Sequence, residues 1–153
     1  MSNRCSLSPM RKSDAHGLIL SFWAEWEQRL CNGDIRVVFR KSVAIIETPS
    51  FLYAYLNKPI QKIVGRAQIE RIARHNLEEC LTFGELSGYS TEDIKAYCGY
   101  RSLIVFTLGS FQVASKPLAL KDLKDKYNFV PSPQAILLSE DGKNEVDARL
   151  GFN

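Results

Sequence analysis

The chain has 153 residues, 45% of them hydrophobic and 24% charged, which is the size and composition of one globular domain with an ordinary core. No apolar run is long enough to cross a bilayer and the polar start does not resemble a signal peptide, so we expect a cytoplasmic protein without a membrane segment. A formal net charge of only +3 gives no global positive field that would by itself indicate nucleic-acid binding.

Residues 1–16 are polar and are expected to form a flexible N-terminal arm. The most informative stretch, SFWAEWEQRLCNGDIRVVFRK, follows at residues 21–41. Its first half predicts a helix that Ser21 caps and that carries one apolar stripe at helical spacing, Phe22, Trp26 and Leu30. Gly33 then ends the helix, since glycine tolerates the left-handed backbone that is common just past a helix C-terminus.

The second half of this stretch predicts a strand. Val37 and Phe39 point to one side of it, and the other side carries Arg36, Val38 and Arg40. We expect the two arginines on an exposed face, close to a tryptophan of the preceding helix. An anionic, aromatic partner suits such a surface, and nucleic acid fits that description best.

The middle of the chain predicts a hairpin of two strands. Residues 51–56 alternate as a strand, and Pro59 turns the chain at residues 57–58 because it has no N–H to give to a ladder. Residues 60–72 form a long strand in which Gly65 marks a bulge or a close approach. Between residues 36 and 74 there are eight basic and only two acidic residues, which predicts a basic face on the middle of the protein.

The second half of the chain predicts short helices at residues 76–81 and 91–98, the latter ended by Gly99, and a buried strand at residues 103–111. A further helical turn follows Pro117. Several strands with two or three short helices between them give an α+β fold, a small open or closed barrel. We expect an N-terminal arm (1–16), one domain (17–138) and a polar, flexible C-terminal tail (139–153).

The order of these segments resembles the ASCH domain, a relative of the PUA, EVE and YTH domains. The similar segments are the strand, helix, Asn-Gly and basic strand that end at Lys41, YAYLNKPIQKIVGRAQIERI (Tyr53–Ile72), SLIVFTLGSFQVASKPLALKDL (Ser102–Leu123) and VPSPQ near Val130. Together they span Leu18–Leu137, nearly the whole chain. The resemblance implies a small PUA-like β-barrel with a cleft beside the helix-to-strand junction.

Two positions depart from the family pattern that lines this cleft. Gly33 and Arg40 match its glycine and its arginine, but Ile35 stands in place of a lysine and Val38 in place of an acidic residue. Some ASCH relatives are small amidohydrolases that act on acetylated cytidine, and that lysine takes part in their mechanism. Ile35 cannot act as a base, a nucleophile or a charge partner, so the resemblance implies that this activity has been lost.

Trp23, one position off the apolar stripe, is a candidate for stacking on a base, the alternative being a packing role. Arg40 and Lys41 are candidates for phosphate or base-edge contacts, the alternative being a surface salt bridge. Catalysis, if present, would fall to Arg40, Lys41 and Glu85. Glu85 lies within one residue of the place where the resemblance puts an acidic side chain of the amidohydrolases. The candidate nucleic-acid-binding residues are Trp23, Arg36, Arg40, Lys41, Tyr53, Asn57, Lys58 and Gln134.

No metal site and no cofactor are predicted. The four cysteines have no metal-ligand spacing with either histidine, and we expect them to be reduced thiols in or near the core. They are Cys5, Cys31, Cys80 and Cys98.

The sequence therefore predicts a protein that binds RNA or a modified nucleotide through a basic cleft. Trp23, the strand at residues 36–41 and the turn at residues 57–58 would form this cleft. One alternative is an ASCH-type enzyme, either a ribonuclease or a nucleoside amidohydrolase. The other is a regulatory module whose basic face meets an acidic protein. Whether the chain is an enzyme, and its oligomeric state, are left open.

Overall fold

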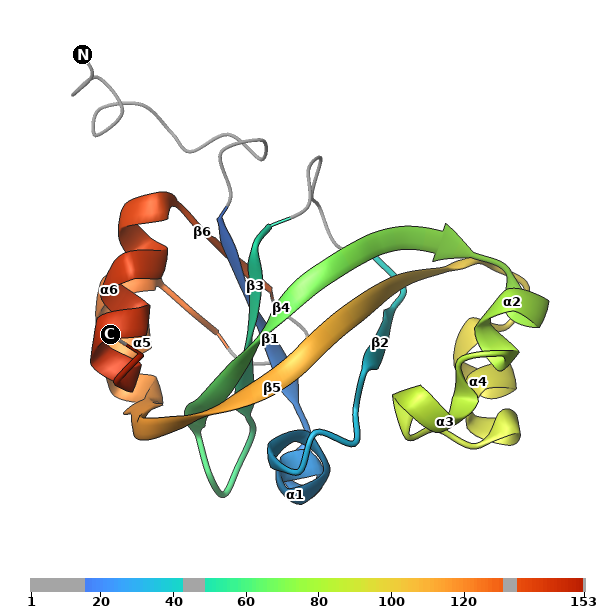
Figure 1. The fold of residues 1–153 in the computed structure, drawn as a ribbon, viewed down its shortest axis with the longest axis horizontal. Helices are drawn as coiled ribbons and strands as arrows, with labels where there is room; N and C mark the ends of the chain where they lie inside the picture. Colours follow the sequence, from blue (N-terminus) through green and yellow to red (C-terminus); the bar gives the residue numbers. More distant parts are fainter. Residues whose placement is uncertain (1–15, 43–48, 131–134, 153) are drawn as a thin grey trace, which may run out of the picture.

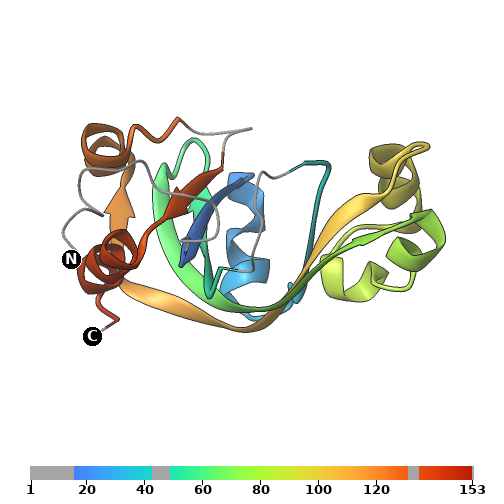
Figure 2. The ribbon, with the colours of Figure 1, turned by 90° about the horizontal axis from the view of Figure 1, so that it is seen from above.

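The computed structural model describes residues 16–42, 49–130 and 135–152. In this part of the chain six strands form one mixed sheet in the order β2-β5-β4-β3-β1-β6, in which the β1–β3 pair is parallel and the other pairs are antiparallel. The sheet is strongly curved, and β4 and β5 sweep along the molecule as one twisted ribbon (Figures 1 and 2). The strands are β1 Gly17–Phe22, β2 Val37–Arg40, β3 Phe51–Leu56, β4 Lys62–His75, β5 Leu103–Ala119 and β6 Ile136–Leu138.

Helices lie at both ends of this ribbon (Figure 1). One end carries α2 Leu77–Leu81, α3 Gly84–Ser87 and α4 Thr91–Cys98, and the other carries α5 Leu120–Tyr127 and α6 Glu140–Leu150. A 3-10 turn, Ala24–Trp26, leads into α1 Glu27–Cys31. The expected α+β class is confirmed, with more helices than the two or three predicted. The described strands form an open barrel, because the edge strands β2 and β6 do not pair with each other.

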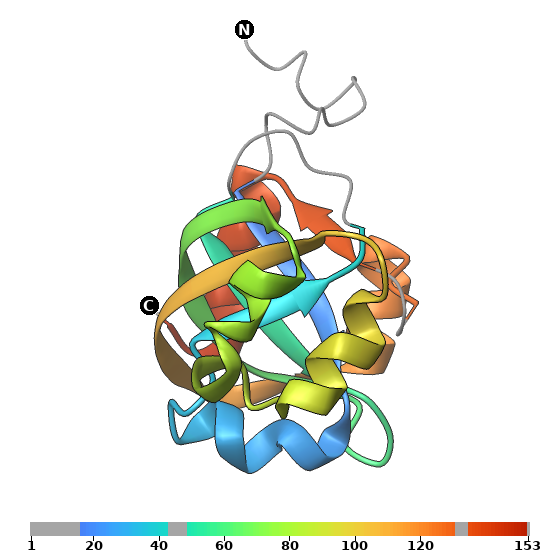
Figure 3. The ribbon, with the colours of Figure 1, turned by 90° about the vertical axis from the view of Figure 1, so that its right-hand side faces the viewer.

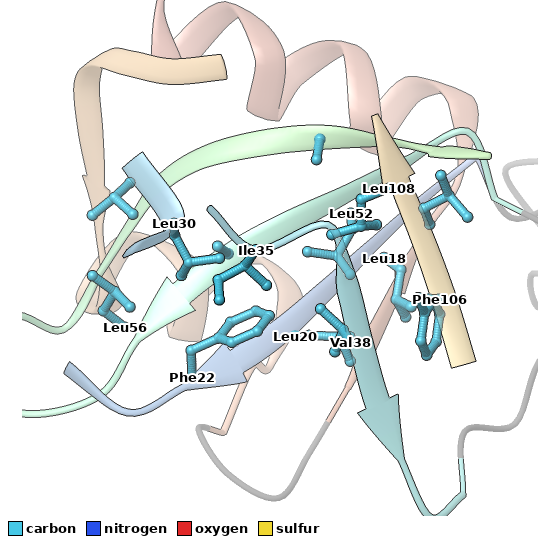
Figure 4. Packing of buried hydrophobic residues seen from close by; sticks show 14 of the residues in the cluster. Leu18, Leu20, Phe22, Leu30, Ile35, Val38, Leu52, Leu56, Phe106 and Leu108 are labelled. Carbon is cyan, nitrogen blue, oxygen red and sulfur yellow. The ribbon is translucent and has the colours of Figure 1, made fainter. Parts of the chain in front are cut away.

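Alternation along β3 divides its side chains between two hydrophobic cores. Leu52, Ala54 and Leu56 are fully buried on one face, among side chains of β1, β2, β5 and α1 (Figure 4). Tyr53 and Tyr55 are fully buried on the other face, together with residues of α5 and α6. A third core joins β2 and β5 to α2 and α4. Burial on both faces explains why β2 and β3 are almost continuously apolar in sequence.

The helix that was expected to begin at Ser21 begins later. Ser21 and Phe22 belong to β1, where they continue the parallel pairing with β3, and helical structure starts only at Ala24. The prediction was wrong because the backbone ladder of the sheet overrides the helical spacing of the apolar residues. The end of the helix was predicted correctly, since Gly33 has a φ of 80° and its N–H donates to the Leu30 carbonyl at 3.0 Å.

The predicted hairpin is present, and residues 57–60 form the β3–β4 turn, with a cis peptide bond before Pro59. Gly65 is the close approach that the sequence predicted. An added Cβ there would collide with the Gln112 carbonyl oxygen and come within 2.5 Å of the Phe111 ring. The register of the β4–β5 ladder also shifts next to Gly65, as a bulge requires.

The flexible tail expected after Ser139 is instead helix α6, so this expectation is wrong. The Ser139 side chain caps the helix by accepting a hydrogen bond from the Gly142 N–H at 3.2 Å. Val146 and Leu150, one turn apart, are fully buried against the sheet. This pair gives an otherwise polar helix an apolar contact with the sheet, and composition alone does not reveal such a pair.

A buried ionic cluster around Asp147 also holds α6 against the sheet. The Asp147 side chain accepts hydrogen bonds from the Tyr53 hydroxyl at 2.6 Å and from Lys143 Nζ at 2.7 Å, and it pairs with Arg66 Nη1 at 2.9 Å. Burial, together with the hydrogen bond to Asp147, raises the pKa of Tyr53 well above its ordinary value. The Arg66 guanidinium lies between two aromatic rings, those of Phe51 and Phe152.

Most of the predicted N-terminal arm, residues 1–15, lies outside the described residues. His16 lengthens the sheet, since its N–H donates to the Leu138 carbonyl at 2.7 Å and its carbonyl accepts from the Ser50 N–H at 2.9 Å. In the part of the chain that the structure describes, no helix is long and apolar enough to span a bilayer.

Candidate nucleic-acid interface

The sheet is open between its edge strand β2 and the C-terminal half of β1, and we call this opening the seam. The other edge strand, β6, pairs with β1 only at residues 17–19. Beyond that point the Ser21 carbonyl accepts a hydrogen bond from Arg40 Nη2 of β2 at 2.7 Å. Arg40 Nη1 donates to the Phe39 carbonyl at 2.8 Å, and the guanidinium carbon lies 5.0 Å from the centre of the Phe22 ring. The Arg40 side chain therefore bridges the seam.

Arg40 is a half-buried cation that makes no ion pair with a carboxylate of the described residues. Burial lowers the pKa of its guanidinium, and the nearby Tyr97 and Tyr89 act in the opposite direction. A charge removed from water without a counter-ion raises the free energy of the protein, and a bound anion would lower it again. Among the described residues, the seam therefore carries a positive charge that contacts two backbone carbonyls and an aromatic ring.

A pocket of about 530 Å³ opens beside the end of this seam, and we call it the Trp23 pocket. The loop after β1 and the β3–β4 turn form it together, and the Asn57 N–H joins the two by donating to the Phe22 carbonyl at 2.9 Å. Figure 3 shows α1 (blue) and the β3–β4 turn (blue-green) along the same end of the molecule. The lining residues are Trp23, Ala24, Glu25, Asn57, Lys58 and Pro59.

The Trp23 pocket offers an aromatic face and polar groups to a ligand. The Trp23 side chain is 68% exposed, which is unusual for a tryptophan and leaves its ring available for stacking. The Oδ1 atom of Asn57 is buried and accepts no hydrogen bond from the described residues. A buried acceptor without a donor is unfavourable, so a ligand N–H or O–H that reached it would be bound preferentially. Lys58 is exposed and adds a positive charge.

A series of aromatic side chains extends from the region of Arg40 toward α4. Tyr89 packs edge-on against Trp26 at 5.0 Å between ring centres and stacks on Phe39 at 6.0 Å. Tyr97 of α4 stacks on Tyr89 at 6.5 Å, and Lys41 Nζ lies 5.0 Å over the Tyr97 ring. Sequence reasoning missed Tyr89 and Tyr97, because nothing in their local pattern shows that they face β2.

The structure brings four of the predicted binding residues to one end of the molecule. Trp23, Asn57 and Lys58 line one pocket, and Arg40 contacts β1 directly before it. Lys41 is exposed, and its Nζ contacts the Tyr97 ring of α4. Sequence reasoning missed Glu25, another residue of the pocket, although its position two residues after Trp23 was a usable signal.

Three predicted placements are wrong. Arg36 and Arg40 were expected on an exposed face, but both are half-buried, and Arg36 Nε donates to the Leu108 carbonyl of β5 at 3.0 Å. Tyr53 was expected to reach a ligand, but it is fully buried and bonded to Asp147, because its face of β3 is covered by α6. Gln134 lies outside the described residues.

The catalytic candidate Glu85 lies on α3, is exposed, and makes no ion pair with a described residue. Ile35, which stands where the resemblance places a lysine, is 2% exposed in the core beneath β1. Its surroundings are apolar and would not accept a charged side chain in its place.

The sequence predicted that all four cysteines are reduced, and the three that the structure describes are free thiols. Cys80 and Cys98 are buried, Cys31 is half-buried, and Cys5 lies outside the described residues. Burial raises the pKa of Cys80 to about 11, so this thiol is a poor nucleophile at neutral pH. Among the described residues no group of histidine, cysteine, aspartate and glutamate side chains is arranged to hold a metal ion.

No protein-family model matches the chain. An ASCH domain-containing ribonuclease from Zymomonas mobilis is 24% identical over 126 residues, which cover 80% of this chain and 84% of that protein. The crystal structure of ASCH from Zymomonas mobilis superposes with a TM-score of 0.77 at 20% identity, over 87% of this chain and 94% of that one. The N-terminal domain of Staphylothermus marinus McrB gives a TM-score of 0.58 at 7% identity, over 93% and 99% of the two chains. These likenesses confirm the fold that the sequence resemblance implied.

Proposed function

Because the chain has the fold of an ASCH domain, we propose that it binds single-stranded RNA, or a nucleotide with a modified base, at the Trp23 pocket. The observation that carries this proposal is one pocket lined by an exposed tryptophan, a lysine and a buried acceptor that no described residue bonds, directly beside an arginine that pairs with no carboxylate of the described residues. The similarity to a protein named as a ribonuclease supports RNA as the ligand.

Each group has a separate part in this binding. A base stacks on the ring of Trp23, an interaction worth about 1–3 kcal/mol in single-strand binding proteins. Asn57 Oδ1 accepts a hydrogen bond from an amino or imino group of the base, which selects its edge. Lys58 and Arg40 neutralise phosphates on either side, so affinity decreases as salt increases.

The test is the fluorescence anisotropy of a labelled single-stranded hexanucleotide, titrated at two salt concentrations. Trp23→Ala and Lys58→Ala should weaken binding at least fivefold. Lys62→Ala is the matched control, because Lys62 is also exposed but is not among the residues that line the pocket. Absence of binding at low salt, or equal affinity of all four proteins, would contradict the proposal.

RNA cleavage is a second candidate, favoured by the presence of a carboxylate and an ammonium group in the same pocket. Glu25 and Lys58 both line it. In this scheme Glu25 takes the proton of a 2′-hydroxyl, and the 2′-oxygen attacks the adjacent phosphorus. The bond from phosphorus to the 5′-oxygen breaks, and that oxygen takes a proton from Lys58. The products are a 2′,3′-cyclic phosphate and a 5′-hydroxyl end.

Glu25→Gln separates binding from cleavage. It should retain the affinity of the wild type for RNA and lose at least a hundredfold in the rate of cleavage, since general-base catalysis contributes about 10²–10⁴-fold. A substrate with a 2′-deoxyribose at the scissile position should bind but remain intact. Cleavage of that substrate, or full activity of Glu25→Gln, would refute this mechanism.

A further inference from the structure

Arg40 has a counterpart two strands away on the same face of the sheet. In the ladders, Arg40 of β2 and Arg74 of β4 are both paired with Ile104 of β5. Directly opposed residues of neighbouring strands point to the same face, so the two arginines and Ile104 form one cross-strand row. Two strand spacings place the arginine Cα atoms about 10 Å apart.

The side chain of Arg74 is exposed, and only its Nη1 atom makes a hydrogen bond with the described residues. Its Nη1 donates to the Ser102 hydroxyl at 3.1 Å, and it makes no ion pair with a described carboxylate. Ser102 directly follows Arg101, which is exposed, and Tyr100 is fully exposed in the turn between α4 and β5. Arg74 therefore lies next to a turn that carries an exposed arginine and an exposed aromatic ring.

Arg71 shows that this arrangement is specific to one face. It is also exposed on β4, but it is paired with Thr107. Thr107 stands one residue from Phe106, whose side chain is in the same core as Ile104, so Thr107 and Arg71 point to the opposite face. Arg71 and Arg74 thus carry the same charge on the same strand, and only Arg74 faces the side of Arg40.

We propose that RNA bound at the Trp23 pocket continues along an arginine track formed by Arg40, Arg74 and Arg101. This inference rests on the proposed function and specifies its ligand as an oligonucleotide of several residues rather than a free nucleoside or mononucleotide. Guanidinium groups spaced along a strand contact phosphates without regard to base identity. Tyr100 stacks on a base at the far end of the track.

The length dependence of binding tests this inference. We would measure the affinity of a labelled single-stranded oligouridine of 3 and of 12 nucleotides for the wild type, Arg74→Ala/Arg101→Ala and the control Arg71→Ala. The wild type should bind the 12-mer at least tenfold more tightly than the 3-mer. The double variant should lose this advantage and keep its affinity for the 3-mer, and Arg71→Ala should behave as the wild type.

Salt dependence gives an independent readout. Loss of two phosphate contacts should reduce the slope of log affinity against log salt by about 1.4, since each contact to a single strand contributes about 0.7. Arg101→Ala alone avoids any effect on the fold through Ser102 and should reduce the slope by about half as much. Equal affinity of the wild type for both lengths, or equal 12-mer affinity of the double variant and Arg71→Ala, would overturn the inference. If the wild type binds neither length, the proposed function itself fails.

Discussion

Asp147 allows the clearest test of how the C-terminal helix is held. Its side chain is 4% exposed and faces two cations, Arg66 at 2.9 Å and Lys143 at 2.7 Å, whose side chains are 13% and 17% exposed. Asp147→Ala removes the carboxylate with which both cations pair and leaves the buried Tyr53 hydroxyl without its acceptor. Removal of one partner from a buried ion pair costs about 3–5 kcal/mol, and the residual exposure of the cations favours the lower half of that range.

Urea unfolding followed by circular dichroism measures this loss, and a thermal scan should show a Tm lower by roughly 10 °C. Glu145→Ala is the matched control, because Glu145 lies on the same helix and pairs with Lys126 at 2.6 Å, and these two side chains are far more exposed than the Asp147 cluster, at 33% and 54%. That pair should be worth less than about 1 kcal/mol. Asp147→Asn should lie between the two variants, since it keeps an acceptor and loses the charge. A loss below about 1 kcal/mol in Asp147→Ala would refute the argument that a buried ionic cluster docks α6.

Three further predictions concern the core and the backbone. Gly65→Ala should destabilise the protein by about 2 kcal/mol or more in urea unfolding because its Cβ meets another strand, whereas Gly33→Ala, with open space but a φ of 80°, should cost about 1 kcal/mol. Equal losses would contradict this reading. Trp26→Ala should lower the free energy of unfolding by about 2 kcal/mol because the ring packs on the core. Trp23→Ala should change it by less than about 0.5 kcal/mol because that ring is exposed. A larger loss in Trp23→Ala than in Trp26→Ala would contradict this assignment of the exposed ring. Burial raises the pKa of Cys80 from its ordinary value of 9.0 to about 11. The contribution of this shift to stability is fully present below pH 9.0 and is lost as the pH rises through about 11. The free energy of unfolding, measured from pH 8 to 10.5, should therefore fall more in the wild type than in Cys80→Ala. Parallel curves would refute that assignment.

Sequence reasoning succeeded where a local pattern and a backbone requirement coincide. The alternation in β3, the end of α1 at Gly33 and the close approach at Gly65 all follow from residues that permit few other arrangements. Failure came where a contact distant in sequence decides the outcome. Pairing with β3 makes Ser21 part of a strand, and α6 covers the face of Tyr53.

The candidate site shows the same division. Residue chemistry was sufficient to select Trp23, Asn57 and Lys58, and the fold then placed them around one pocket. The seam that Arg40 bridges was not predictable, because it depends on which strands form the edges of the sheet. The pairing of Arg40 and Arg74 with the same residue of β5 likewise appears only in the strand register.

The most direct test of the central claim is the tryptophan fluorescence of the Trp26→Phe protein during titration with single-stranded RNA. Trp23 is then the only tryptophan, since the chain has two. We predict saturable quenching that weakens as salt is raised and weakens further in the additional Arg40→Ala variant. Unchanged emission at low salt, in a protein that anisotropy shows to be bound to the RNA, would place the ligand elsewhere and contradict the account.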